Sequence, residues 1–171
     1  KPYRGGLPLI VNFMNNFYGM GGQPQGETMG FGMLARLGAG MNPEQMHAER
    51  VDGYSPLAVA DAILRKREVI DKGDGPVLLD TVTYRYSGHS PSDQGSYRER
   101  SEVEAWQKED PIVLFGQSLV AAKVCKTGDL EAIQKRPPQQ IRCRDIVVSD
   151  GDVRAARRRL LRKFTHGEVA G

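Results

Sequence analysis

The stretch "SPLAVADAILRKREVIDKGDGPVLLDTVTYRY" (Ser55–Tyr86) decides the fold class. Its first part opens on a serine and a proline, has apolar residues three and four positions apart, and ends at Gly73, which predicts a helix over 56–72. The apolar run that follows predicts a strand over Pro76–Tyr86. A weaker strand is predicted before the helix, over Gln45–Val51. The order strand, helix, strand favours a parallel crossover, and therefore an α/β fold with a parallel sheet flanked by helices.

A further strand is predicted near the start of the chain. "LPLIVNFM" (Leu7–Met14) is an almost continuous apolar run, which is typical of a strand buried on both faces of a parallel sheet. The other predicted elements are a short helix over 31–37 that ends at Gly38, a loop over 87–100, and helices that begin near Ser101, Pro111 and Thr127, the first with a capping box of Ser101 and Glu104. Because Lys1 stands so close to the first strand, we expect the N-terminal part of the fold to be missing.

The composition is that of a soluble globular domain. The chain has 171 residues, of which 39% are hydrophobic and 26% charged, enough for one domain with its own core. No run of 18 apolar residues occurs and no secretion signal is visible, so we expect neither a membrane partner nor export. The two cysteines, Cys125 and Cys143, lack any partner motif, which favours a reducing compartment over a disulfide scaffold or a zinc site.

The charge of the chain is unevenly distributed. Residues 1–135 carry 15 Lys and Arg against 17 Asp and Glu, a net charge of −2, whereas residues 136–171 carry nine against four, a net charge of +5. We therefore predict a domain over 1–135 and a basic tail over 136–171. The tail is interpreted either as a solvated terminus or as a basic helix for an acidic partner, with nucleic acid the less favoured ligand.

Polar residues follow two of the predicted strands. Asn15 and Asn16 end the first apolar run, and His89 follows the last one. The asparagine pair either forms a turn or offers amide oxygens to Mg²⁺ or Ca²⁺ beside a diphosphate. His89 is either an ordinary loop histidine or a group that contacts a phosphate or transfers a proton.

Four blocks carry a family resemblance. The sequence resembles the alpha subunit of thiamine diphosphate-dependent 2-oxo acid dehydrogenases. The four blocks occur in the family's order and are "NNFYGMGG", "AERVDGYSPLAV", "GPVLLDTVTYRYSGHSPSD" and "SYRERSEVEAWQKEDPI". The resemblance implies an enzyme that decarboxylates a small 2-oxo acid and passes the acyl group to the lipoyl group of an acyltransferase. It also implies thiamine diphosphate and Mg²⁺ as cofactors, and a beta subunit as partner in a heterotetramer.

The resemblance assigns roles residue by residue. The Asn16 side chain and the Tyr18 backbone carbonyl match the metal ligands that also bind the cofactor, and His89 matches a catalytic, cofactor-binding histidine. Ser90 matches a serine that is phosphorylated in mitochondrial members. The third metal ligand would be the aspartate of a Gly-Asp-Gly on an earlier strand. The "GDG" at Gly73–Gly75 follows the asparagines, so we interpret it as a turn that ends a helix and expect the chain alone to be inactive.

Two departures from the family pattern concern the cofactor and the substrate. Met14 stands where many members have a glutamate, near a cofactor contact at the strand end, and Ser87 stands where animal pyruvate dehydrogenases have a histidine. Ser87 favours a bacterial, acetoin-type member over a pyruvate enzyme, and thus the cytoplasm, with the mitochondrial matrix as the alternative. The alternative function is a catalytically incomplete interaction module with a basic tail.

Overall fold

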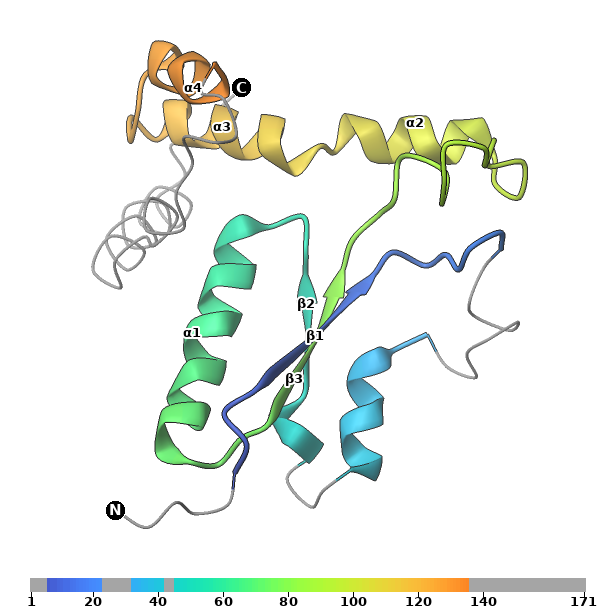
Figure 1. Cartoon of the computed structure of the whole chain (residues 1–171). Coiled ribbons are helices and arrows are strands. Elements are labelled where there is room, and N and C mark those ends of the chain that lie inside the picture. Colours follow the sequence, from blue (N-terminus) through green and yellow to red (C-terminus); the bar gives the residue numbers. More distant parts are fainter. Residues whose placement is uncertain (1–5, 23–31, 42–44, 136–171) are drawn as a thin grey trace. The chain divides into compact units, whose positions relative to one another are not determined.

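The structure, a computed structural model, describes residues 6–22, 32–41 and 45–135, and Figure 1 draws its elements. The chain divides into two compact units, Lys1–Asp110 and Pro111–Gly171. The first unit is built on a three-stranded parallel sheet in the order β1-β3-β2. Its strands are β1 (Ile10–Asn15), β2 (Glu49–Asp52) and β3 (Val77–Val82).

The central strand β3 forms the middle of the core. Val77, Leu78, Leu79 and Asp80 are all almost completely buried. By contrast, β1 lies at the edge of the described sheet, and Met14 on it is 62% exposed. The prediction that Leu7–Met14 is buried on both faces is therefore wrong, because Asn12 and Met14, which alternate along β1 and share one face, are exposed.

Helix α1 (Pro56–Lys72) covers one face of this sheet. Its start is fixed by Ser55, whose hydroxyl accepts a hydrogen bond from the Ala58 N–H at 3.3 Å, and its end by Gly73 in the left-handed conformation, with φ of 84°. Ala62 of α1 packs against Leu79 and Val51 in the hydrophobic core. These caps and this burial confirm the predicted helix.

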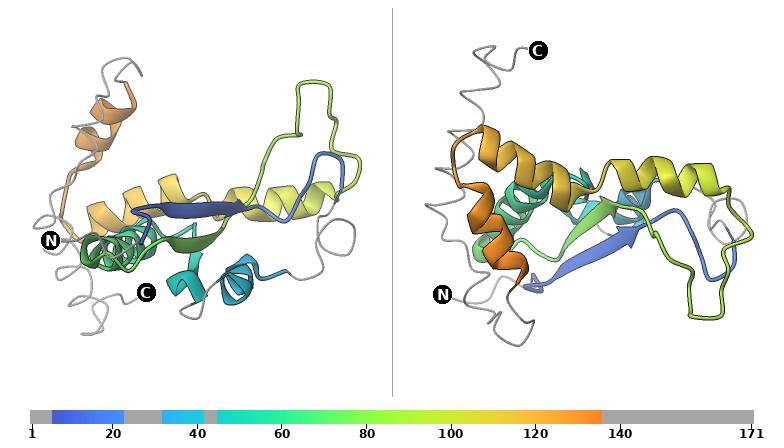
Figure 2. Two further views of the ribbon diagram at one scale, coloured as in Figure 1. Left: turned by 60° about the horizontal axis from the view of Figure 1, so that its bottom comes forward. Right: turned by 90° about the horizontal axis from the view of Figure 1, so that it is seen from above.

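The opposite face of the sheet is covered by η1 (Leu34–Gly40), a 3₁₀ helix. Side chains alternate along a strand, so Leu79, which packs against α1, and Asp80, which accepts a hydrogen bond from the Ala35 N–H of η1, point to opposite faces. Figure 2 shows the sheet with these two helices. The predicted α/β fold with a parallel sheet flanked by helices is confirmed.

Several predicted boundaries move. The strand predicted over Pro76–Tyr86 ends at Val82, because the aromatic residues beyond it no longer pair with a neighbouring strand. The segment 45–47 is a 3₁₀ turn, η2 (Gln45–His47), and the strand begins only at Glu49. The short helix predicted over 31–37 occupies Leu34–Gly40.

The helix predicted to begin near Ser101 is α2 (Arg100–Lys108). Glu99 is its N-cap residue and makes no side-chain cap hydrogen bond. Ser101 lies inside the first turn, so the predicted capping box of Ser101 and Glu104 is wrong. Glu104 instead pairs with Arg100, four positions earlier on the same helix, at 3.0 Å.

The second unit contains the helices α3 (Pro111–Ala121) and α4 (Thr127–Gln134), whose starts match the prediction. Gly116 lets them approach, since a Cβ atom there would stand 3.2 Å from Leu130. An apolar groove of about 580 Å³ runs along both helices. No helix within the described part of the chain is long and apolar enough to cross a membrane. The predicted basic tail, 136–171, lies outside the described residues.

Candidate functional site

Two polar segments leave the sheet at the same edge. Strands β1 and β3 are parallel neighbours in a register that pairs Asn15 with Val82. Beyond this pair, the Thr83 N–H donates to the Asn15 carbonyl at 2.9 Å. The residues after β1 and those after β3 therefore begin side by side at the carboxyl edge, where open α/β sheets bind ligands.

The asparagine pair forms a tight turn. The side-chain oxygen of Asn16 accepts a hydrogen bond from the Tyr18 N–H at 3.1 Å, and that of Asn15 accepts one from the Phe17 N–H at 3.4 Å. Between them Phe17 has φ of 66°, a left-handed conformation that is uncommon for such a residue. The turn interpretation does not exclude a cation site, because an amide oxygen has two lone pairs and can hold an N–H and a cation together.

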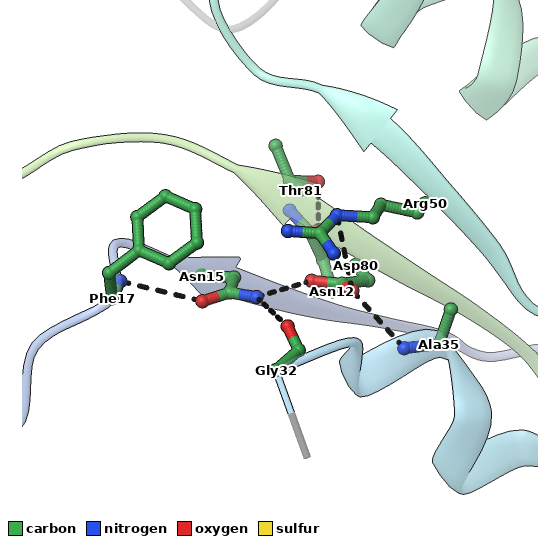
Figure 3. A network of polar contacts seen from close by, with 8 residues as sticks. All are labelled: Asn12, Asn15, Phe17, Gly32, Ala35, Arg50, Asp80 and Thr81. Carbon is green, nitrogen blue, oxygen red and sulfur yellow. Dashed lines mark hydrogen bonds and ion pairs between the residues drawn. The ribbon is translucent and has the colours of Figure 1, made fainter. Parts of the chain in front are cut away.

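The two asparagines differ in burial and in partners. Asn15 is only 4% exposed, and its amide donates to the Asp80 carboxylate at 3.0 Å and to the Gly32 carbonyl at 3.4 Å. Figure 3 shows this network between the strands and η1. Asn16 is half-buried and holds the turn that follows. Asn16 is therefore the better placed of the two to offer an oxygen to a ligand.

The side chain of Tyr18 connects the two segments. Its hydroxyl donates to the Glu102 carboxylate of α2 at 2.6 Å. Its ring meets that of Tyr84 edge-on, with centroids 6.0 Å apart, and that of Tyr97 at 5.6 Å. The turn after β1, the loop after β3 and helix α2 thus pack together around one buried tyrosine.

Arg98 fixes the loop after β3 from within. Its guanidinium lies 5.5 Å from the ring centroid of Tyr18 and 5.4 Å from that of Tyr84, a cation–π arrangement. It also donates to the backbone carbonyls of Tyr86 at 2.8 Å and Ser87 at 2.9 Å. Burial raises the pKa of Tyr84, and the hydrogen bond to Glu102 raises it further.

His89 stands exposed in a loop that is ordered around Asp93. The Asp93 carboxylate accepts hydrogen bonds from the His89 N–H at 2.7 Å, the Gly95 N–H at 2.8 Å and the Tyr97 hydroxyl at 2.9 Å. The bond from His89, followed by that from Gly95, lowers the pKa of Asp93. Within the described residues no hydrogen bond or ring contact joins the side chains of His89 and Asn16. Asn16 and His89 follow neighbouring strands at the same end of the sheet, and the ring of Tyr18 packs against Tyr97 in the loop that carries His89.

The described residues include no group of three or more histidines, cysteines or carboxylates arranged to hold a metal ion. The candidate donors of the predicted site are of another kind, the amide oxygen of Asn16 and the backbone carbonyl of Tyr18, which are neutral hard ligands that suit Mg²⁺. The "GDG" at 73–75 ends helix α1, where Gly73 and Asp74 donate their N–H groups to the carbonyls of Ile70 and Val69. Its interpretation as a turn is confirmed.

Four residues of this region were missed by sequence reasoning: Asp80, Tyr84, Arg98 and Glu102. One signal was available for Asp80. A carboxylate inside the apolar run "VLLDTV" is costly to bury unless it has partners, so its presence indicates a polar network. The other three residues are brought together only by the tertiary structure.

Comparison with known proteins gives a consistent result. The family model described as "Dehydrogenase E1 component" matches residues 5–144. The pyruvate dehydrogenase E1 component subunit alpha of Rickettsia conorii is 31% identical over 130 residues, which are 76% of this chain and 39% of that protein.

Two eukaryotic relatives agree. The mitochondrial pyruvate dehydrogenase E1 component subunit alpha of Dictyostelium discoideum is 37% identical over 75% of this chain and 33% of its own length. The type I mitochondrial subunit alpha of Ascaris suum is 34% identical over 79% of this chain and 33% of its own length. The chain spans about a third of the length of the curated relatives it matches. Since the family model covers most of the sequence, the chain belongs to the dehydrogenase E1 component family.

Proposed function

We propose that this chain supplies the metal- and diphosphate-binding edge of the alpha subunit of a thiamine diphosphate-dependent 2-oxo acid dehydrogenase. The observation that carries the proposal is the turn of Asn16 and Tyr18 at the carboxyl edge of the sheet, packed through Tyr18 against the loop of His89. Membership of the E1 family and the names of the relatives support it.

Each proposed site residue has a distinct task. The Asn16 amide oxygen and the Tyr18 carbonyl would hold Mg²⁺, whose charge neutralises a diphosphate. Thiamine diphosphate, when bound, supplies the carbanion chemistry that decarboxylates a 2-oxo acid. His89 is exposed on a loop whose backbone is fixed by Asp93, so its imidazole can contact the cofactor and hold a proton at the reacting centre.

Pyruvate is the substrate we favour, because the relatives described above are named pyruvate dehydrogenases. Acetoin is the second candidate, and the observation that favours it is Ser87. Arg98 holds the Ser87 carbonyl, so the hydroxyl lies on an ordered and exposed part of the loop. The two candidates are separated by measuring kcat/KM for pyruvate and for acetoin on the complete enzyme, and the preferred substrate is the one with the higher value.

The proposal includes the partners of an E1 alpha subunit. A beta subunit would complete the active site, and a lipoyl-bearing acyltransferase would accept the acyl group. One relative comes from a bacterium and others are named mitochondrial, which supports either the bacterial cytoplasm or the mitochondrial matrix as the proposed compartment. Modification of Ser90 is a narrower proposal for the mitochondrial case. Its hydroxyl is exposed and lies 3.1 Å from that of Ser92.

Asn16→Ala tests the proposed site in the complete alpha subunit assembled with its beta subunit. Loss of a metal ligand should strongly weaken the binding of thiamine diphosphate with Mg²⁺, as measured by calorimetry. Asn12→Ala is the matched control, because it removes an exposed amide from the preceding strand β1. That amide accepts from the Thr81 hydroxyl on the other face of the sheet, so its loss should leave this affinity unchanged. Near-normal cofactor affinity of the Asn16 variant would refute the role of Asn16.

The second candidate function is a non-catalytic interaction module. The apolar groove along α3 and α4 favours it, because Ile112, Val113 and Ile133 stay exposed there. A module of this kind should bind its protein partner without any cofactor. Binding to nucleic acid through the basic tail would instead show a steep dependence on salt.

A further inference from the structure

Asp80 is a carboxylate at the centre of the sheet. It is completely buried, with Val77, Leu78 and Leu79 before it on the same strand. A buried carboxylate is strongly destabilising unless hydrogen bonds compensate it, and well-packed apolar side chains often replace buried charges at no loss of stability. Packing alone therefore does not explain an aspartate here, and the partners of Asp80 indicate what it does.

Those partners come from three other segments. The Asp80 carboxylate accepts from the Asn15 amide of β1 at 3.0 Å and from the Ala35 N–H of η1 at 3.2 Å. Arg50 of β2 adds an ion pair at 3.9 Å. In Figure 3 these groups surround the carboxylate between the strands and η1.

The charge of Asp80 decides which way the Asn15 amide points. An ionised carboxylate only accepts hydrogen bonds, so the NH₂ group of Asn15 must face it and the oxygen must face away. In that orientation the Asn15 oxygen meets the Phe17 N–H at 3.4 Å, and the NH₂ group also reaches the Gly32 carbonyl. The amide is planar, so fixing one end fixes the other.

We propose that Asp80 is a positioning residue that acts through Asn15 to set the turn in which Asn16 and Tyr18 offer their oxygens to the metal. The proposal rests on the proposed function of that turn. The carboxylate orients the Asn15 amide, this amide holds the Phe17 N–H, and the Asn16 oxygen then holds the Tyr18 N–H. Partners of this kind behind metal ligands govern the affinity of the metal.

Asp80→Asn is the test variant, because it keeps the shape and removes the charge. The new amide has one acceptor oxygen where the carboxylate had two. It therefore cannot accept from both the Asn15 amide and the Ala35 N–H, because its own NH₂ group would point at one of these donors. Thr81→Val is the matched control. It removes another hydrogen bond between β1 and β3, from the Thr81 hydroxyl to the Asn12 oxygen at 2.6 Å, on the opposite face of the sheet.

The measurement is Mn²⁺ binding in the presence of thiamine diphosphate, followed by the EPR signal of free Mn²⁺, on the complete alpha subunit with its beta subunit. We expect Asp80→Asn to raise the Kd for Mn²⁺ by about 10-fold, the lower end of the range for groups bonded directly to metal ligands, because Asp80 acts through Asn15. Thr81→Val should lower the melting temperature and leave the Kd unchanged. Equal Kd values for the two variants would overturn the proposal.

A double variant that exchanges the two side chains tests the positioning role even where Asp80→Asn alone folds poorly. In Asn15→Asp/Asp80→Asn the amide and the carboxylate exchange places, and the carboxylate now on β1 still accepts from the Phe17 N–H. Mn²⁺ affinity should recover relative to Asn15→Asp alone, and no recovery would contradict the positioning role. Wild-type enzyme that takes up no Mn²⁺ would refute the proposed function itself.

Discussion

Tyr18 combines two tasks in one residue. Its backbone carbonyl belongs to the proposed metal site, whereas its side chain packs against Tyr84 and Tyr97 and hydrogen-bonds Glu102. The two tasks use different atoms, so mutation separates them. The side chain stabilises the assembly of the two loops, and the carbonyl would bind the ion.

Tyr18→Phe should therefore destabilise folding and leave the metal site in place. Loss of the hydroxyl bond to the Glu102 carboxylate should lower the free energy of unfolding by about 1.5–3 kcal/mol, the range for hydrogen bonds to charged groups. Urea denaturation measures this loss, and calorimetry should find cofactor binding close to that of the wild type. Loss of cofactor binding comparable to that of Asn16→Ala would mean that the phenol acts in the site.

The carboxyl of Asp93 gives the His89 loop a defined dependence on pH. Hydrogen bonds from His89, and then from Gly95, lower its folded pKa below the ordinary value of 3.8. The group therefore contributes stability that is fully present above the unfolded pKa and is lost as the pH falls through the folded pKa.

The loop should accordingly keep its order at pH 5 and lose it only below pH 3.8, as the pH falls through the lowered pKa of Asp93. The ¹³C resonance of the Asp93 carboxyl in a pH titration checks this prediction. A midpoint for Asp93 at or above the ordinary pKa of 3.8 would contradict the account.

At the scale of elements, the loop between β3 and α2 is shaped by close backbone contact. A Cβ atom on Gly88 would stand 2.1 Å from the Asp93 carbonyl oxygen, far inside any allowed contact. Only glycine lets the chain close around the Asp93 side chain at this point.

Gly88→Ala should open this loop without unfolding the sheet. Hydrogen exchange at the amides of His89 and Gly95 should accelerate, because both donate to Asp93. Gly21→Ala is the control, since a Cβ atom there meets nothing within 4 Å. Unchanged exchange at both amides in the Gly88 variant would show that the loop tolerates the side chain.

The elements also show what a sequence can predict. Helix α1 was predicted almost to the residue because its signals are local, with Ser55 at one end and Gly73 at the other. The strand β3 was predicted to run four residues too far at its C-terminal end, because Tyr84 and Tyr86 favour strands and yet pack into the aromatic cluster beyond the sheet.

At the scale of the whole molecule, the fold class followed from the order of the elements, and the family from motifs in sequence order. The site residues Asn16, Tyr18 and His89 were named from the resemblance. The residues that hold them in place, such as Asp80 and Glu102, were not predicted. The Asn15–Asp80 and Tyr18–Glu102 hydrogen bonds join residues that are 65 and 84 positions apart in the sequence. Contacts over such distances become visible only when the strands are paired.

The central claim is that the turn after β1 binds the metal of a thiamine diphosphate site. The most direct measurement is anomalous X-ray scattering from crystals of the complete alpha and beta subunits grown with Mn²⁺ and thiamine diphosphate. We predict an anomalous peak bonded to the Asn16 side-chain oxygen and the Tyr18 carbonyl oxygen, at about 2.0–2.3 Å as in sites for small hard cations. A peak bonded elsewhere, with neither oxygen as a ligand, would contradict the account.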